Sequence, residues 1–113
     1  MQTKAQQSLG VGGELTFETV PQILVKTQKT LEEFARHSAP SDIFVVDFAH
    51  VSHVDTASIS LVFEWMRIIR KIQPTLTLKV AHAPRSFLSL TKLYGVDEIL
   101  IADGRIQKFV KRP

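Results

Sequence analysis

The 113-residue sequence fits one domain with a modest core, because 44% of its residues are hydrophobic and 22% are charged. Cysteine is absent, which excludes disulfides and thiolate metal sites, and the net charge is only +3. No stretch approaches the ~18 consecutive apolar residues of a membrane-spanning helix, and the N-terminus lacks the apolar core of a secretory signal, so we expect a cytoplasmic protein.

The two ends of the chain are predicted to lie outside the folded domain. Residues 1–8 are polar and predict a mobile N-terminal segment, whereas the domain itself is expected to span residues 9–103. The remaining residues, 104–113, form a basic tail that carries Arg105, Lys108, Lys111 and Arg112. Such a short tail is usually solvated and lacks the interleaved aromatic residues of a base-stacking surface, so we expect no nucleic-acid binding.

Residues 8–17 predict one or two short edge strands, loosened by Gly10, Gly12 and Gly13. These glycines do not indicate a phosphate-binding loop, because a third spaced glycine and a Lys-Ser or Lys-Thr ending are both absent.

The first helix is predicted to begin after Thr19, a suitable N-cap, with Pro21 in its first turn, and to stop at Ala39-Pro40. Its apolar residues recur at helical spacing: Val20, Ile23, Leu24, Leu31 and Phe34.

Strands and helices alternate over the rest of the chain. Residues 42–48 form a continuous apolar run rich in β-branched and aromatic residues, which predicts a central strand buried on both faces. A helix over 56–72, a strand over 75–82, a helix over 84–94 capped by a glycine, and a short strand over 97–102 follow. This order favours a single α/β domain with a small mixed or partly parallel sheet of about four to five strands and about three main helices.

The predicted helix over 56–72 has an apolar arc wider than one sheet face needs. Its polar stripe consists of Ser60, Glu64, Arg67 and Lys71. The opposite stripe, expected to face the sheet, consists of Leu61, Trp65, Ile68 and Ile72, extended by Val62 and Ile69. Ile59, Phe63 and Met66 lie on a flank near Arg70, and two interpretations stay open: a neighbouring helix covers the flank, or it binds another protein.

The stretch "HVSHVDTAS", residues 50–58, contains side chains that are common in metal sites and catalytic sites. His50, His53 and Asp55 could bind a metal, but they lie in a predicted loop with no further ligand near in sequence, which favours surface histidines. Thr56 or Ser58 as a nucleophile would need a base and an oxyanion hole, and the Gly-x-Ser-x-Gly elbow is absent. We therefore expect neither a metal site nor catalysis here.

Two other interpretations of this stretch fit the residues better. Asp55 can cap the following helix, because its carboxylate can accept hydrogen bonds from the first free N–H groups. Thr56 would then present its hydroxyl at an exposed helix N-terminus, where a phosphate would meet free N–H groups and so could act as a switch. The residues alone leave both interpretations open.

The sequence also resembles the STAS domain family, named for sulfate transporters and anti-sigma factor antagonists, from about Gly13 to Ile101. The resemblance rests on "FVVDFAHVSHVDTASISLV", "TLTLKVAH" and "LTKLYGVDEIL". It places the family's phosphorylatable or recognition residue at Thr56, after the matching Asp55. Anti-sigma factor antagonists typically read Asp-Ser-Ser-Gly at this point. Asp-Thr together with "LTKLYGV" is more similar to the MlaB group, the STAS subunits of an ABC transporter that moves phospholipid between bacterial membranes.

That resemblance implies a cytoplasmic, non-enzymatic subunit without a cofactor, which binds the transporter's ATPase and meets the inner membrane only through it. The contact surface expected for this partner comprises the loop from His53 to Thr56 together with Ser58, Ile59 and Phe63. The alternative that the resemblance implies is an anti-sigma factor antagonist, bound by an anti-sigma factor kinase and switched by phosphorylation of Thr56.

Overall fold

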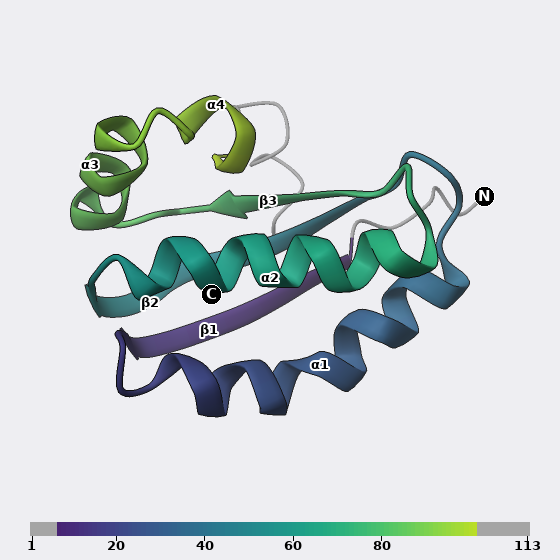
Figure 1. Ribbon diagram of the computed structural model, residues 1–113, viewed down its shortest axis with the longest axis horizontal. Coiled ribbons are helices and arrows are strands. Elements are labelled where there is room, and N and C mark those ends of the chain that lie inside the picture. Colours follow the sequence, from purple (N-terminus) through teal and green to yellow (C-terminus); the bar gives the residue numbers. More distant parts are fainter. Residues whose placement is uncertain (1–6, 102–113) are drawn as a thin grey trace.

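The computed structural model describes residues 7–101, which fold around a sheet of three parallel strands in the order β1-β2-β3. The strands are β1 (Gln7–Leu15), β2 (Ile43–Val54) and β3 (Thr77–Ala81). The crossover helices between them are α1 (Val20–His37) and α2 (Ala57–Ile72), and α3 (Arg85–Leu93) and α4 (Asp97–Leu100) follow β3 (Figure 1). The predicted α/β fold is therefore confirmed.

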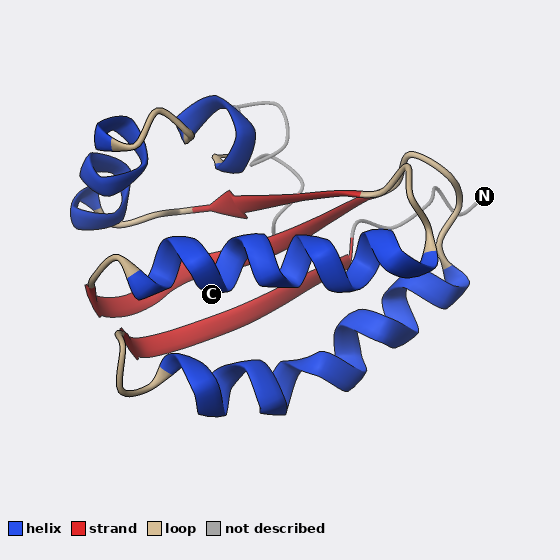
Figure 2. Cartoon of the chain, in the orientation of Figure 1, coloured by secondary structure: helices blue, strands red, loops and turns tan. Residues whose placement is uncertain are grey.

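Both crossover helices cover the same face of the sheet, because two right-handed crossovers that step in the same direction place their helices on one side (Figure 2). The main core lies between this face and the helices, where Phe44, Val46 and Phe48 of β2 point toward α1 and α2. Val45 of the same strand packs with Ala81 in a separate small cluster. The central strand is thus buried on both faces, as predicted.

The core also shows which side chains of α2 are buried, and most of them agree with the prediction. Trp65 is fully buried, and its indole N–H donates a hydrogen bond of 2.8 Å to Thr27 Oγ1 on α1. Two flank residues, Ile59 and Met66, are buried as well, so neighbouring elements cover most of the flank. Ile72 was expected to face the sheet, but it sits in the last turn of α2, beyond the core, and is 39% exposed.

Within residues 7–101 the sheet has fewer strands than expected, because residues 97–100 form a helix and not the beginning of the strand predicted for 97–102. Asp97–Leu100 is the short helix α4, and Ile101 makes only an isolated bridge to Val80. The turn at Gly95, with φ of +70°, reverses the chain just before, and the acidic residues Asp97 and Glu98 suit the positive end of a helix. All pairs among the described strands are parallel, so the sheet is not mixed.

A second correction concerns the length of β2, which continues through the stretch predicted to be a loop. His50 and His53 lie on this strand and pair with Gly12 and Glu14 of β1. The prediction failed because the exposed polar residues that follow Phe48 lack the apolar run used to recognise the strand.

The glycines of the first segment lie within β1, which is an edge strand of the described sheet, as predicted. Its pairing with β2 shifts register between Gly10 and Gly12 and again after Gly13, which has a φ of +75°. At Gly12 an added Cβ would lie 3.1 Å from His50 Cβ, so the close approach of the strands favours glycine there.

The ends of the chain are only partly described. β1 begins at Gln7, so the last two residues of the predicted mobile segment 1–8 belong to a strand. The rest of that segment and the basic tail lie outside the described residues. None of the helices within residues 7–101 is long and apolar enough to cross a membrane.

Candidate functional site

The candidate site lies at the edge of the sheet where the parallel strands end and α1 and α2 begin, on the left in Figure 1. Asp55, between β2 and α2, organises this edge. Its Oδ1 accepts a hydrogen bond of 2.9 Å from the Ala57 amide, and its Oδ2 accepts one of 3.0 Å from the Phe17 amide in the β1–α1 turn. Asp55 therefore caps α2, as predicted, and also fixes the neighbouring turn.

A similar prediction for Thr19 is only half right. Thr19 precedes α1, but its hydroxyl makes no bond to the helix. The hydroxyl instead donates to the Glu14 carbonyl at 2.7 Å and accepts from the Thr16 amide at 2.9 Å. It therefore stabilises the β1–α1 turn, which carries Phe17 to its place beside Asp55.

Thr56 lies exposed at the start of α2, and its side chain makes no capping hydrogen bond. The first three amides of α2 already have acceptors, however. Ala57 N donates to the Asp55 carboxylate, Ser58 N to the Asp55 carbonyl at 3.0 Å, and Ile59 N to the Thr56 carbonyl at 3.1 Å. A phosphate on Thr56 would not find the free amides that the sequence led us to expect, so it would project from the surface as an added negative charge.

Two residues of the expected contact surface are not on the surface at all. Ser58 is completely buried, and its hydroxyl donates to the Asp55 carbonyl at 2.7 Å. Ile59 is only 9% exposed and packs in the main core. Both are therefore removed from the contact surface, because the first turn of α2 points these side chains inward rather than toward a partner.

An open groove of about 500 Å³ runs between the start of α2 and helix α3. It is lined by Val54, Asp55, Thr56, Ser86, Ser89, Leu90 and Leu93. Two large apolar side chains are exposed here: Leu93, which lines the groove, is 74% exposed, and Phe17, whose amide bonds to Asp55, is 80% exposed. We call the groove residues together with Phe17 the Thr56 surface.

Sequence reasoning missed the α3 half of this surface, because helical periodicity does not say which distant helix lies beside Thr56. One signal was present. The sequence places Phe17 between polar residues in a turn, and it places Leu93 and Tyr94 at the end of a helix just before Gly95. Large apolar or aromatic side chains at turns and helix ends are often exposed, and exposed ones can bind a partner.

The other predicted residues are not among those that line the groove. His50 and His53 are exposed on β2, and the described residues contain no group of side chains able to hold a metal ion. The ring of His82 is hydrogen-bonded to Asp47 at 3.0 Å. His82 therefore does not act as a base for the Thr56 hydroxyl. Phe63, 39% exposed, lines a different groove near Ile99.

Comparison with known proteins gives two findings. The family model described as "Mlab, STAS domain" matches residues 1–102. The fold is similar to that of the anti-sigma factor antagonist SpoIIAA in its unphosphorylated form, with a TM-score of 0.64 and 16% sequence identity, over 98% of this chain and 96% of that chain. At that identity the likeness shows a shared fold. A sequence search among curated proteins found no significant match.

Proposed function

This chain belongs to the STAS domain family of the MlaB type, and from that premise we propose that it is a non-enzymatic subunit that binds the ATPase of an ABC transporter for phospholipid trafficking. Binding would stabilise the ATPase and regulate its activity. In this role the chain is cytoplasmic and lies beside the inner membrane only through its partner. The observation that carries the proposal is the family match, together with an exposed Thr56 surface suited to binding a protein.

The composition of the Thr56 surface supports a protein partner. Exposed Phe17 and Leu93 can provide apolar anchors, and Thr56 and the serines of α3 provide polar groups. Interfaces commonly combine a few buried aromatic or aliphatic anchors with hydrogen-bonding groups. The small hydroxyl side chains leave room for a partner to approach the start of α2 closely.

The surface is also pre-organised. Asp55 bonds to both α2 and the β1–α1 turn, and the Asp55 carbonyl accepts from the amide and the hydroxyl of Ser58. A partner would therefore meet a backbone that is already fixed, which lowers the entropy lost on binding. His53 stays a predicted rim residue, since it is exposed on β2 close in sequence to Asp55.

The test is to purify the tagged full chain gently from its own cells and to identify bound proteins by mass spectrometry. The proposal predicts that an ABC-type ATPase is recovered from wild-type cells and is lost with Thr56→Glu. Thr30→Glu, the same substitution at an exposed threonine on α1, is the matched control and should retain the ATPase. Recovery of the ATPase with wild type and both variants alike would show that the partner binds elsewhere.

A second candidate function is that of an anti-sigma factor antagonist switched by phosphorylation of Thr56. The fold likeness to SpoIIAA and the exposed Thr56 hydroxyl favour it. It predicts that an anti-sigma factor kinase is recovered instead, and that the intact mass of the recovered chain includes one phosphate that Thr56→Ala removes. An ATPase partner without this phosphate would exclude it.

A further inference from the structure

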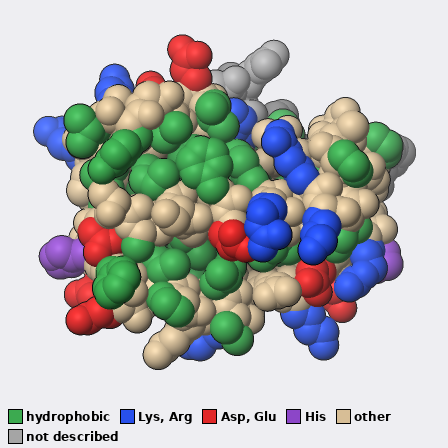
Figure 3. Space-filling view, viewed as in Figure 1, with side chains coloured by type: hydrophobic (Ala, Val, Ile, Leu, Met, Phe, Trp, Pro, Cys, Tyr) green, Lys and Arg blue, Asp and Glu red, His purple; other side chains and the backbone are tan. Residues whose placement is uncertain are grey.

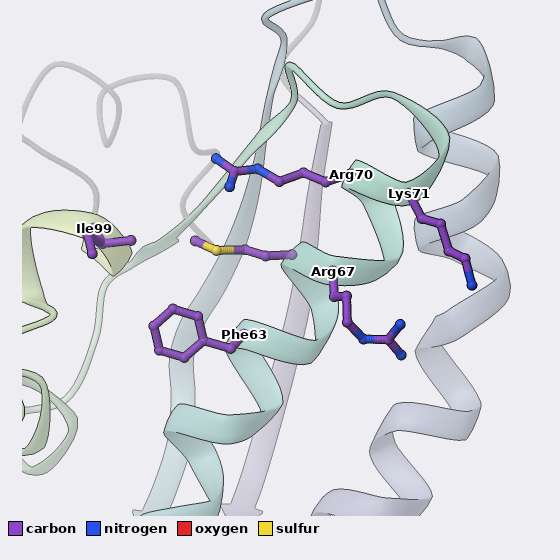
Figure 4. A pocket seen from close by; sticks show the side chains of 6 residues that line it. Phe63, Arg67, Arg70, Lys71 and Ile99 are labelled. Atoms are coloured by element: carbon purple, nitrogen blue, oxygen red, sulfur yellow. The ribbon is translucent and has the colours of Figure 1, made fainter.

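An open groove lies between the second half of α2 and helix α4, separate from the Thr56 surface. It has a volume of about 680 Å³ and is lined by Phe63, Met66, Arg67, Arg70, Lys71 and Ile99. Figure 4 shows that Phe63 and Arg70 extend from α2 toward Ile99, whereas Arg67 and Lys71 project from the other side of α2. We call it the α2–α4 groove.

The floor of this groove is apolar. Met66 is only 6% exposed, but Phe63 is 39% exposed and Ile99, opposite it, is 49% exposed. Figure 3 shows hydrophobic side chains gathered over this region, with Lys and Arg side chains along one side. The apolar wall formed by α4 is held in place, because Lys79 Nζ donates to the carbonyl groups of Glu98 and Ile99 at 3.0 and 2.7 Å.

The charged side of the groove is positive, since its lining residues include three cations and no carboxylate. Arg67 pairs with Glu64, and this hydrogen bond holds the pKa of that carboxyl below its usual range. Arg70 donates through Nε to the Leu76 carbonyl at 2.9 Å, which fixes its guanidinium beside the groove. Lys71 shows no ion pair or hydrogen bond within residues 7–101, so its charge is available to a ligand.

We propose that the α2–α4 groove docks a segment of a partner protein that carries apolar side chains next to carboxylates. The apolar side chains would cover Phe63 and Ile99, a carboxylate would face Arg70, and Lys71 on the far edge of α2 would add to the positive potential. A concave surface suits an inserted segment better than it suits a flat bilayer. The chain's own tail matches the groove less well in charge, because Arg105, Lys108, Lys111 and Arg112 would be repelled by Arg70 and Lys71. The proposal does not depend on which protein binds the Thr56 surface.

The test selects binders from a library of random peptides displayed on phage, with the full chain as bait. We expect the enriched peptides to combine acidic residues with Leu, Phe or Trp. Their binding should weaken as salt rises, because exposed ion pairs are screened. It should also weaken by about fivefold or more with Arg70→Gln combined with Lys71→Gln, which removes the two positive charges that the proposal assigns to the carboxylates.

Two matched controls lie on α1. Lys26→Gln with Lys29→Gln changes the net charge equally and should alter binding by less than about twofold, because both side chains lie outside the groove. Phe63→Ser should abolish selection, whereas Val25→Ser, at a residue 77% exposed, should not. Circular dichroism melts would confirm that each variant is folded.

Three outcomes would overturn the proposal. The first is that no enriched peptide distinguishes wild type from Phe63→Ser. The second is that the enriched peptides lack acidic residues. The third is that the chain co-sediments with phosphatidylglycerol vesicles, that the double variant on α2 abolishes this co-sedimentation, and that no enriched peptide competes with the vesicles. This result would assign the groove to anionic lipid.

Discussion

Asp55 and Thr56 are adjacent, yet their side chains have opposite relations to the fold. The Asp55 carboxylate holds two backbone amides, from Ala57 and Phe17, whereas the Thr56 hydroxyl holds none of the helix amides and faces solvent. Changes at Asp55 should therefore act on stability and changes at Thr56 on binding.

Asp55→Ala should lower the free energy of unfolding by about 1–2 kcal/mol, the usual cost of losing an N-terminal cap, and should loosen the turn that carries Phe17. Asp55→Asn should cost less, because its amide oxygen can still accept from Ala57. Urea unfolding measures both. Thr56→Ala serves as the control and should stay within about 0.5 kcal/mol of wild type. An unchanged midpoint for Asp55→Ala would mean that the two hydrogen bonds contribute no net stability.

Thr56→Glu should change the free energy of unfolding by no more than about 1 kcal/mol, since a negative charge is tolerated at the positive end of a helix. The same charge at the centre of an interface would be desolvated without a partner, so the variant should lose its protein partner. Thr56→Ser keeps the hydroxyl and should keep the partner. Thermal unfolding beside co-purification tests both. If Thr56→Glu unfolds the domain, Thr56 is structural; if it folds and binds fully, the interface lies elsewhere.

At the scale of the secondary-structure elements, a buried hydrogen bond between side chains connects helices α1 and α2. The Trp65 indole donates to the Thr27 hydroxyl, which itself donates to the Ile23 carbonyl of α1 at 2.8 Å. Trp65→Ala should destabilise the domain by about 3–5 kcal/mol, because it removes the largest fully buried side chain.

Thr27→Val tests the hydrogen bond separately. It leaves the buried indole N–H without an acceptor, which should cost about 1–3 kcal/mol, whereas Thr27→Ser keeps the hydroxyl and should cost less. In a Trp65→Phe background the N–H is gone, so the cost of Thr27→Val should fall clearly. Equal costs in the two backgrounds, measured by urea unfolding, would show that the contact is not coupled.

The elements that the sequence predicts well are those with a long periodic or continuous apolar pattern. The helix of residues 56–72 was expected almost to the residue, because its apolar spacing, Asp55 and Pro74 define its ends. The strand expected at 97–102 was wrong, because a short apolar run after a turn is compatible with either structure.

Contacts between segments that lie far apart in the sequence could not be predicted from the sequence alone. Asp47 and His82 are 35 residues apart, and only the parallel pairing of β2 with β3 brings them to 3.0 Å. For the same reason, the Asp55 cap could be predicted from its neighbours, whereas its bond to Phe17 and the α3 wall of the groove could not. The burial of Ser58 and Ile59 depends in addition on how the first turn of α2 is rotated against the sheet.

At the scale of the whole molecule, two of the grooves in the described fold lie along α2, one at Thr56 and one beside Ile99. Their lining residues do not overlap, so a partner could contact both from one side or two partners could bind together. The proposed subunit role, in which the chain acts through the proteins it binds, leads to a prediction about the chain alone.

The isolated chain should not hydrolyse ATP. Gly10, Gly12 and Gly13 are used inside β1, and the β1–α1 turn at residues 16–19 contains no glycine or lysine that could cradle a phosphate. Phosphate release should therefore match the buffer blank for a rigorously purified preparation. Traces of a co-purified ATPase would give turnover that scales with impurity and is unaffected by point changes in this chain. Turnover that persists through purification and is abolished by one substitution, such as Thr56→Ala, would instead show that the active site belongs to this chain and that the subunit role is wrong.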